Sequence, residues 1–286
     1  MAAPRALQEV GDVIPRRTLA TALAAVALCL SFAACTTRSQ DPRAMYQVPP
    51  LRIGITSLSP PFAFVLDGRF VGLEVDFARE LSRTLGRRIK LVDLPFGSLL
   101  PALMEGRVDV VMAGLGVTPA REVRVAFSRP YLHSGLTALL RRSDEGRFRS
   151  APCEARFSVL SGSTGERFVR DRCKKSPAVF PTDSREIAVS EVRLGRSDIM
   201  VSEASVIAWA VAGDEGDLTL RREPLVREDL AWAVRRQDVE LLRQIDGALE
   251  QWRAYGTRAL VLDRWIPFWR ELEAYSESMP PPTRLP

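Results

Sequence analysis

The order of strands and helices occurs twice along the chain, and this repeat constrains the fold more than any other feature. Three strands and two helices are predicted to alternate in the first half, over residues 51–55, 73–85, 89–92, 99–105 and 108–113. The second half has the same order, over residues 157–160, 165–172, 178–180, 185–194 and 198–201. Strands that alternate with helices indicate parallel α/β architecture. The sequence therefore predicts two α/β halves.

Two segments are expected to cross between the halves. The first leads into the polar stretch from Ser143 to Gly146, and the second runs from Leu230 to Val234. Two helices are predicted after the second crossover, at residues 239–255 and 257–265. The expected organisation is a first lobe of residues 51–141 plus 234–268, a second lobe of residues 142–233, and a C-terminal tail of residues 269–286 that is disordered from Ser278.

The N-terminus is typical of an export signal. Arg16 and Arg17 precede an uncharged run over residues 18–34, which ends in two alanines before Cys35. That run is short for a transmembrane helix, which needs about 20 apolar residues. Residues 32–35 resemble the lipobox of bacterial lipoproteins, which implies that residues 1–34 are removed and that Cys35 carries the lipid. The expected location is the periplasm or cell envelope, with a lipid anchor in a membrane and a polar tether over residues 35–50. The alternative is an ordinary cleaved signal followed by an unmodified cysteine.

Two further cysteines lie in the second half. Cys153 precedes a predicted strand, and Cys173 follows the helix after that strand. The start of a strand and the end of the next helix lie at the same edge of a βα unit, so a Cys153–Cys173 disulfide is expected in an exported protein. Two unpaired thiols are the alternative.

Composition argues against several classes of function. The formal net charge is +5, and 37 of the 40 basic residues are arginines spread along the chain. A nucleic-acid-binding surface would place them in a stripe with aromatic residues, so no nucleic-acid partner is expected. The single histidine, His133, has no nucleophile motif around it and is interpreted as structural. No metal-ligand cluster or phosphate loop is present in the sequence, so neither a metal nor a cofactor is expected.

Several short motifs follow one another in a fixed order. They are PPFAF at 60–64, VGLEVD at 71–76, LPAL at 100–103, GRVD at 106–109, AGLGVTPAR at 113–121, FSRPY at 127–131, GST at 162–164, GRSD at 195–198 and YGT at 255–257. With them, residues 51–268 resemble the family 3 extracellular solute-binding proteins, the receptors of polar amino-acid ABC importers. The resemblance implies a two-lobed periplasmic-binding-protein fold of type II, with two crossover hinge strands and the ligand in the cleft between the lobes. It also implies ABC permease subunits as partners and a monomeric receptor that is not an enzyme.

Arg121 is the candidate partner of the ligand's carboxylate. A planar guanidinium can donate two parallel hydrogen bonds to one carboxylate. Thr118 and Pro119 are expected to begin a short helix, which places Arg121 in its first turn beside free backbone N–H groups. The resemblance supports this choice, because the family places its carboxylate-binding arginine at this Thr-x-x-Arg position.

The second lobe offers further polar candidates. Ser163 and Thr164 stand where a strand turns into a helix, so their hydroxyls and the helix N-terminus can hold the same carboxylate or act as ordinary caps. Glu203 matches the position of the family's ammonium-binding aspartate and is one methylene longer. Its alternative interpretation is a solvated loop carboxylate.

The resemblance also assigns the wall of the cleft. Phe96 matches an aromatic residue that packs on the ligand side chain, and Phe62 lies in the Pro-Pro-Phe motif. This sequence departs from the family in having Ser59 for an aromatic residue, Thr56 for an acidic one, and glycines where serines are common, at Gly114 and Gly116. A less acidic and roomier wall is therefore expected, with a neutral or acidic amino acid as ligand rather than a basic one.

Two other functions remain open. A cyclohexadienyl dehydratase-like enzyme has the same fold and uses an acidic residue as general acid. Val206 stands here where its second carboxyl is expected, although Glu203 could substitute. A sensory module that passes its ligand state to a partner is the other alternative.

Overall fold

The computed structural model describes residues 48–213, 216–221, 224–266 and 268–279. The expected export signal, Cys35 and nearly all of the tether lie outside these ranges. No helix within them is long and apolar enough to cross a membrane.

The first lobe is built on a five-stranded sheet. Its order is β5 (Ile89–Asp93), β1 (Leu51–Ile55), β6 (Val110–Val111), β14 (Ala233–Val234) and β7 (Ala126–Phe127). β1 is parallel to β5 and β6, whereas β14 is antiparallel to both of its neighbours. The sheet is joined by the helices α3 (Leu73–Leu85), α4 (Phe96–Met104), α10 (Val239–Tyr255) and α11 (Thr257–Trp265). The parallel β1–β5–β6 arrangement is the one predicted from the alternation of strands and helices.

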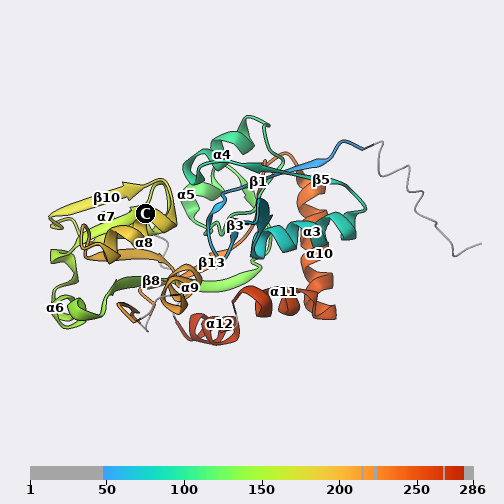
Figure 1. Cartoon of the computed structure of the whole chain (residues 1–286). Coiled ribbons are helices and arrows are strands. Elements are labelled where there is room, and N and C mark those ends of the chain that lie inside the picture. The colour runs from blue at the N-terminus through green and yellow to red at the C-terminus, as the bar shows by residue number, and fades with distance from the viewer. Residues whose placement is uncertain (1–47, 214–215, 222–223, 267, 280–286) are drawn as a thin grey trace, which may run out of the picture. The chain divides into compact units, whose positions relative to one another are not determined.

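The second lobe has its own sheet. Its order is β10 (Ala178–Thr182), β9 (Arg156–Leu160), β11 (Ile199–Glu203), β8 (Leu132–Arg141) and β12 (Leu218–Leu220), and β13 (Val226–Leu230) also pairs with β8. The helices of this half are α6 (Glu145–Ser150), α7 (Thr164–Arg172), α8 (Arg185–Arg193) and α9 (Ala204–Ala212), with the short turns η1 (Arg142–Asp144) and η2 (Pro152–Glu154). Figure 1 shows β8 and β13 running between the two groups of elements.

Smaller elements complete the fold. A three-stranded sheet consists of β2 (Leu58–Ser59), β3 (Ala63–Leu66) and β4 (Arg69–Val71). The four-residue helix α5 (Pro119–Glu122) follows β6, and α12 (Trp269–Ser278) ends the described chain.

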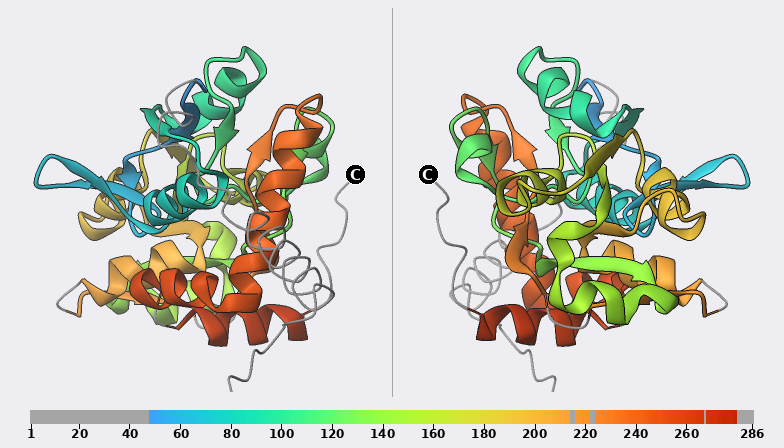
Figure 2. Two further views of the ribbon diagram at one scale, coloured as in Figure 1. Left: turned by 90° about the vertical axis from the view of Figure 1, so that its right-hand side faces the viewer. Right: turned by 90° about the vertical axis from the view of Figure 1, so that its left-hand side faces the viewer.

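Two boundaries differ from the sequence-based expectation. β8 was expected in the first lobe, but it hydrogen-bonds to β11, β12 and β13 of the second sheet. β8 itself is therefore the first crossover, and it pairs with strands of the second sheet along its length. Part of the expected tail is also helical: α12, red in Figures 1 and 2, packs against β8, and the hydroxyl of Ser276 donates to the Ser134 carbonyl at 3.0 Å.

Local signals explain the helix that was predicted best. In α3, Val75, Ala78 and Leu81 are buried on one face, as the 3.6-residue period requires. Gly86 ends the helix in the left-handed conformation, at φ 59°, which glycine adopts without a steric penalty.

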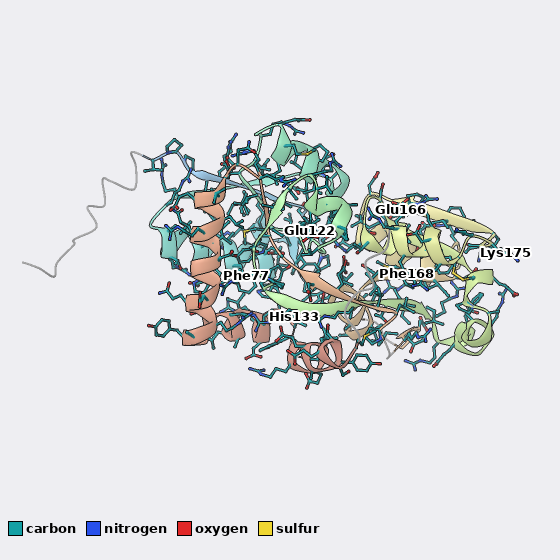
Figure 3. All side chains as sticks on the ribbon, turned by 180° about the vertical axis from the view of Figure 1, so that it is seen from behind. Phe77, Glu122, His133, Glu166, Phe168 and Lys175 are labelled. Carbon is teal, nitrogen blue, oxygen red and sulfur yellow. A yellow bond between two sulfur atoms is a disulfide. The ribbon has the colours of Figure 1, made fainter. Side chains whose placement is uncertain are left out.

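An aromatic cluster fills the first lobe below its sheet. Phe77, labelled in Figure 3, lies 5.5 Å from the rings of Tyr131 and Trp232 and 5.8 Å from that of Trp252, measured between centroids. Glu74 is fully buried beside them and accepts hydrogen bonds from Tyr131, Trp232 and the backbone N–H of Gly114, at 2.6, 2.8 and 2.7 Å. Burial raises the pKa of Glu74, and these three donors oppose that rise. Glu74 thus ties the loop that carries Gly114 to the core.

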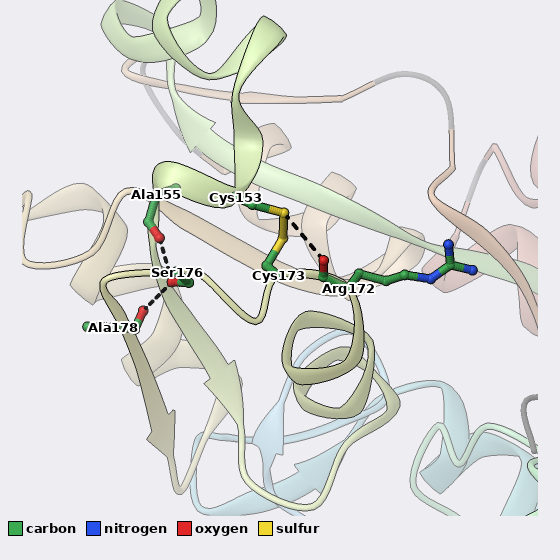
Figure 4. The surroundings of a disulfide bond; sticks show 6 residues. All are labelled: Cys153, Ala155, Arg172, Cys173, Ser176 and Ala178. Atoms are coloured by element: carbon green, nitrogen blue, oxygen red, sulfur yellow. Dashed lines mark hydrogen bonds between the residues drawn. A yellow bond between two sulfur atoms is a disulfide. The ribbon is translucent and has the colours of Figure 1, made fainter.

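The predicted disulfide is confirmed within the second lobe. Cys153 and Cys173 are bonded, with their Cα atoms 4.9 Å apart (Figure 4). The Ser176 hydroxyl donates to the carbonyls of Ala155 and Ala178 beside the bridge, at 2.8 and 3.1 Å. The bridge joins residues 20 positions apart, so it restricts the conformations of the unfolded chain and thereby stabilises the folded lobe.

Candidate functional site

Arg121 lies where the two lobes meet. Its own helix begins as predicted: Thr118 is the N-cap, its hydroxyl accepts from the Arg121 backbone N–H at 3.3 Å, and Pro119 follows. The guanidinium donates to the Gly116 carbonyl of the first lobe at 2.7 Å and to the Gly162 carbonyl of the second at 2.9 Å. The residue is only 8% exposed. Burial lowers the pKa of Arg121, and the negative charges of nearby Glu228 and Glu203 oppose the effect.

The N-terminus of α7 faces Arg121 from the second lobe. The Ser163 hydroxyl accepts from the Glu166 backbone N–H at 3.1 Å, so this side chain caps the helix. The neighbouring hydroxyl of Thr164 is buried and has no hydrogen bond within the described chain. Both residues thus lie beside Gly162, which Arg121 contacts, and the Thr164 hydroxyl also acts on the nearby carboxyl group of Glu228. Figure 3 labels Glu122 of α5 and Glu166 of α7, which mark the two lobes.

Phe62 and Phe96 form the aromatic part of the site. Phe96 begins α4, and its ring centroid lies 5.8 Å from the guanidinium carbon of Arg121. The guanidinium of Arg185 lies 5.0 Å from the centroid of Phe96 and 5.7 Å from that of Phe62. The two rings therefore contact a cation that belongs to the protein itself.

Arg185 is a central residue of the site that sequence reasoning missed. It is the first residue of α8, after the N-cap Ser184, and is 1% exposed. It donates to the Ser59 hydroxyl of the first lobe at 2.6 Å and to both carboxyl oxygens of Glu203, at 3.3 and 3.2 Å. Its position at the start of a helix could be expected from the sequence, as for Ser163. That position alone could not distinguish it among the 37 arginines of the chain.

Glu203, the expected ammonium partner, is already bound on both oxygens. Besides Arg185, the Ser202 hydroxyl donates to it at 2.7 Å. Burial alone would raise the pKa of Glu203, but the Arg185 charge and these hydrogen bonds lower it below the usual range. Glu203 is therefore an ionised carboxylate in a buried ion pair rather than a solvated loop residue.

Glu228 is the second residue that the sequence did not reveal. It lies on β13, is 5% exposed, and neither of its carboxyl oxygens has a hydrogen bond to a described residue. Burial, together with the negative charge of Glu203, raises the pKa of Glu228 to about 8. A carboxyl group that is neutral at pH 7 therefore lies next to Arg121.

The two glycines of the first-lobe loop are places of close approach, not of extra room. A Cβ on Gly114 would lie 2.5 Å from a ring carbon of Phe62, and one on Gly116 would lie 1.9 Å from a carboxyl oxygen of Glu228. The expectation of a roomier wall is wrong, because these two side chains fill the space that a serine would occupy. Thr56, the remaining candidate, is buried directly after β1.

Two other expectations concern residues outside this group. His133 on β8, labelled in Figure 3, contacts Asp229 with 2.7 Å between Nδ1 and Oδ1. No group of His, Cys, Asp and Glu residues in the described ranges could hold a metal ion.

Comparison with known proteins gives the family. Residues 51–268 match the model of the bacterial extracellular solute-binding proteins, family 3. The L-cystine-binding protein TcyJ of Escherichia coli K12 is 26% identical over 219 residues, which cover 76% of this chain and 82% of that protein.

A solved structure and an enzyme are also similar. The structure of holo ArgBP from T. maritima aligns with a TM-score of 0.68 and 30% identity, covering 78% of this chain and 98% of that one. The cyclohexadienyl dehydratase of Pseudomonas aeruginosa PAO1 is 28% identical over 193 residues, covering 66% of this chain and 71% of the enzyme.

Proposed function

Because the chain belongs to the bacterial extracellular solute-binding proteins of family 3, we propose that it is the receptor of an ABC importer and binds an amino acid, or a similar small carboxylate, between its lobes. The observation that carries this proposal is the position of Arg121, whose buried guanidinium reaches carbonyl groups of both lobes. Those contacts use two of its five N–H donors, and a guanidinium in a dry site is suited to a carboxylate. Thr164 and the N-terminus of α7 add donors from the facing lobe.

The charge of the site favours a neutral or acidic ligand. The guanidinium of Arg185 lies beside Ser59, Phe62 and Phe96, which are the residues proposed to line the side-chain part of the cleft. A lysine or arginine ligand would bring a second cation against it in a region of low dielectric constant, where repulsion is strong. An amide or carboxylate would instead accept hydrogen bonds from it.

The other parts of the assignment rest on the sequence. We propose that Cys35 carries a lipid that anchors the receptor in the cell envelope, that ABC permease subunits are its partners, and that it acts as a monomer. In the alternative sensory role, the ligand-bound protein would bind a signalling partner instead of the ABC permease subunits.

A dehydratase remains the second candidate. Its support is the similarity to the Pseudomonas enzyme and the buried Glu228, whose raised pKa suits a general acid. Val206, also buried, takes the place of the second carboxyl that the resemblance calls for. Turnover of a cyclohexadienyl carboxylate by the purified protein would favour this candidate.

The test of the receptor proposal uses Arg121 and an exposed arginine close to it. The twenty common amino acids and L-cystine are screened singly by thermal shift, and the one with the largest shift is titrated by calorimetry. Arg121→Ala is expected to weaken binding at least 30-fold, about 2 kcal/mol or more, because it removes the charge partner of a buried carboxylate. Arg121→Lys should not restore binding, since Lys lacks the planar fork.

Arg124→Ala is the matched control, because Arg124 follows the same helix and is exposed. It should bind like the wild-type protein. Equal affinity of Arg121→Ala and wild type would show that the carboxylate site has been placed wrongly.

A further inference from the structure

Two glutamates, Glu203 and Glu228, are buried near Arg121, and of the two only Glu203 forms an ion pair with a described residue. Glu203 accepts from Arg185 and Ser202, so an incoming ammonium group would have to compete with a buried guanidinium for it. Glu228 offers both of its oxygens, and neither is hydrogen-bonded to a described residue. Buried polar groups nearly always have partners in native proteins, so an unpartnered carboxyl inside a binding cleft points to a ligand.

Glu228 is also close to the proposed carboxylate site. Gly116 connects the two: its carbonyl accepts from Arg121 at 2.7 Å, and its Cα faces the Glu228 carboxyl so closely that a Cβ would be 1.9 Å from an oxygen. In an α-amino acid the carboxylate and the ammonium group are attached to the same carbon. Their two partners on a receptor must therefore be neighbours, as Arg121 and Glu228 are.

We propose that Glu228, rather than Glu203, binds the ammonium group of an amino-acid ligand whose carboxylate is held by Arg121. This inference rests on the proposed function. It leaves the Arg185–Glu203 pair to face the ligand's side chain between Phe62 and Phe96.

The charges around Glu228 make the proposal measurable. The groups that act on it are Arg121 of α5, Arg185 of α8, Glu203 of β11 and the Thr164 hydroxyl of α7. Burial and Glu203 keep the pKa of the free receptor's Glu228 near 8, so the group is mostly protonated at pH 7. An ammonium group at hydrogen-bond distance favours the ionised form and lowers this pKa. Binding at pH 7 should therefore release up to one proton from Glu228 to the buffer.

The experiment is calorimetry at pH 7 in phosphate and in Tris, whose ionisation enthalpies differ, so that the number of protons released is measured directly. The ligands are the amino acid selected by the thermal-shift screen and its des-amino analogue. The wild-type protein should release close to one proton with the amino acid and none with the analogue. Glu228→Gln should release none and bind the amino acid at least 10-fold more weakly, while binding the analogue like the wild type.

Asp229→Asn is the matched control, because it removes the neighbouring carboxylate on β13, which contacts His133 instead of the cleft. It should retain the proton release and affinity of the wild type. Circular dichroism and melting of each variant establish that it is folded. Glu228→Gln is expected to fold, since the carboxyl group it replaces accepts no hydrogen bond within the described ranges.

Three results would overturn the inference, and they can be told apart. If Glu228→Gln keeps the affinity and proton release of the wild type while Glu203→Gln loses amino-acid binding, Glu203 is the ammonium partner. If Glu228→Gln weakens the analogue as much as the amino acid, Glu228 supports the site without binding the ammonium. If the wild-type protein responds to none of the amino acids, the proposed function itself is wrong and the inference falls with it.

Discussion

The two buried glutamates near Arg121, Glu203 and Glu228, have the same side chain, but their pKa values are shifted in opposite directions. Glu203 is paired with Arg185 at 3.2 Å and has a lowered pKa, whereas Glu228 accepts no hydrogen bond from a described residue and has a pKa raised to about 8. The difference shows that burial alone does not decide the charge of a carboxyl group. A cation at hydrogen-bond distance outweighs desolvation at Glu203, and a nearby anion adds to it at Glu228.

The two sites should also differ in what they contribute to the receptor. The Arg185–Glu203 pair joins α8 to β11, and Arg185 also bonds to Ser59 of the other lobe, so it stabilises the contact between the lobes. Burying the carboxyl group of Glu228 without a hydrogen-bonded partner among the described residues costs folding free energy. We therefore expect Glu228 to contribute to ligand binding rather than to stability. Variants that break one site and spare the other therefore test the comparison directly.

The largest effect is expected from breaking the Arg185–Glu203 pair. Arg185→Met should lower the free energy of unfolding by about 3–5 kcal/mol, because it leaves Glu203 charged in a buried site. The double variant Arg185→Met/Glu203→Gln should recover much of that loss, since no isolated charge remains. Chemical denaturation of the two single variants and the double variant measures the coupling. If the two single effects simply add, the ion pair is not a unit.

The next effect is a pH dependence that arises at Glu228. The folded state raises the pKa of this group to about 8, so between about pH 4.5 and pH 8 the folded protein holds a proton that the unfolded chain has released. Folding stability from this group therefore falls as pH rises through that window and is level above it. Each unit of pKa shift is worth about 1.4 kcal/mol, so the gain in stability of Glu228→Gln over wild type should grow by a few kcal/mol between pH 5 and pH 8.5.

Asp229→Asn should show the opposite pH dependence of folding stability when it is measured by the same chemical denaturation. Burial opposes ionisation of Asp229, but His133 and Arg227 lower its pKa. Its contribution is present above the unfolded-state pKa, near 3.9, and is lost as pH falls below it. Because the Asp229–His133 pair is partly exposed to solvent, the variant should differ from wild type at neutral pH by only about 1 kcal/mol. A Glu228→Gln profile parallel to that of wild type would contradict the raised pKa.

Local features of this fold were predictable from the sequence, and long-range ones were not. The helices α3, α10 and α11 have the predicted bounds, because hydrophobic period and glycine stops act over a few residues. Residues 132–141 were counted in the first lobe, but they form β8, which pairs with the second sheet. Its partners are distant in the chain, so the sequence did not indicate them.

The candidate site divides in the same way. Arg121 could be selected because it matches the family's Thr-x-x-Arg motif, in which Thr118 and Pro119 begin a helix. In the structure its guanidinium contacts carbonyl groups of both lobes. Arg185 also stands at a helix start, after the N-cap Ser184, but no matched motif singles it out, and Glu228 lies inside a strand. Their importance comes from burial and from Ser59 and Gly116, which approach them from the other half of the chain. A charged residue that is ordinary in sequence becomes functional through tertiary neighbours.

A last prediction concerns the close contact between Gly116 and Glu228. In Gly116→Ala the new Cβ would lie 1.9 Å from a carboxyl oxygen of Glu228, 2.6 Å from its carboxyl carbon and 3.0 Å from its Cγ. All three atoms belong to one side chain, so the variant should cost about 1–3 kcal/mol of unfolding free energy, as overpacking does. Glu228→Ala removes those atoms, and in that background Gly116→Ala should cost almost nothing. Matching penalties in both backgrounds would mean that Gly116 is required for another reason. If the penalty disappears when the Glu228 side chain is removed, Gly116 is a glycine because a larger residue would collide with Glu228.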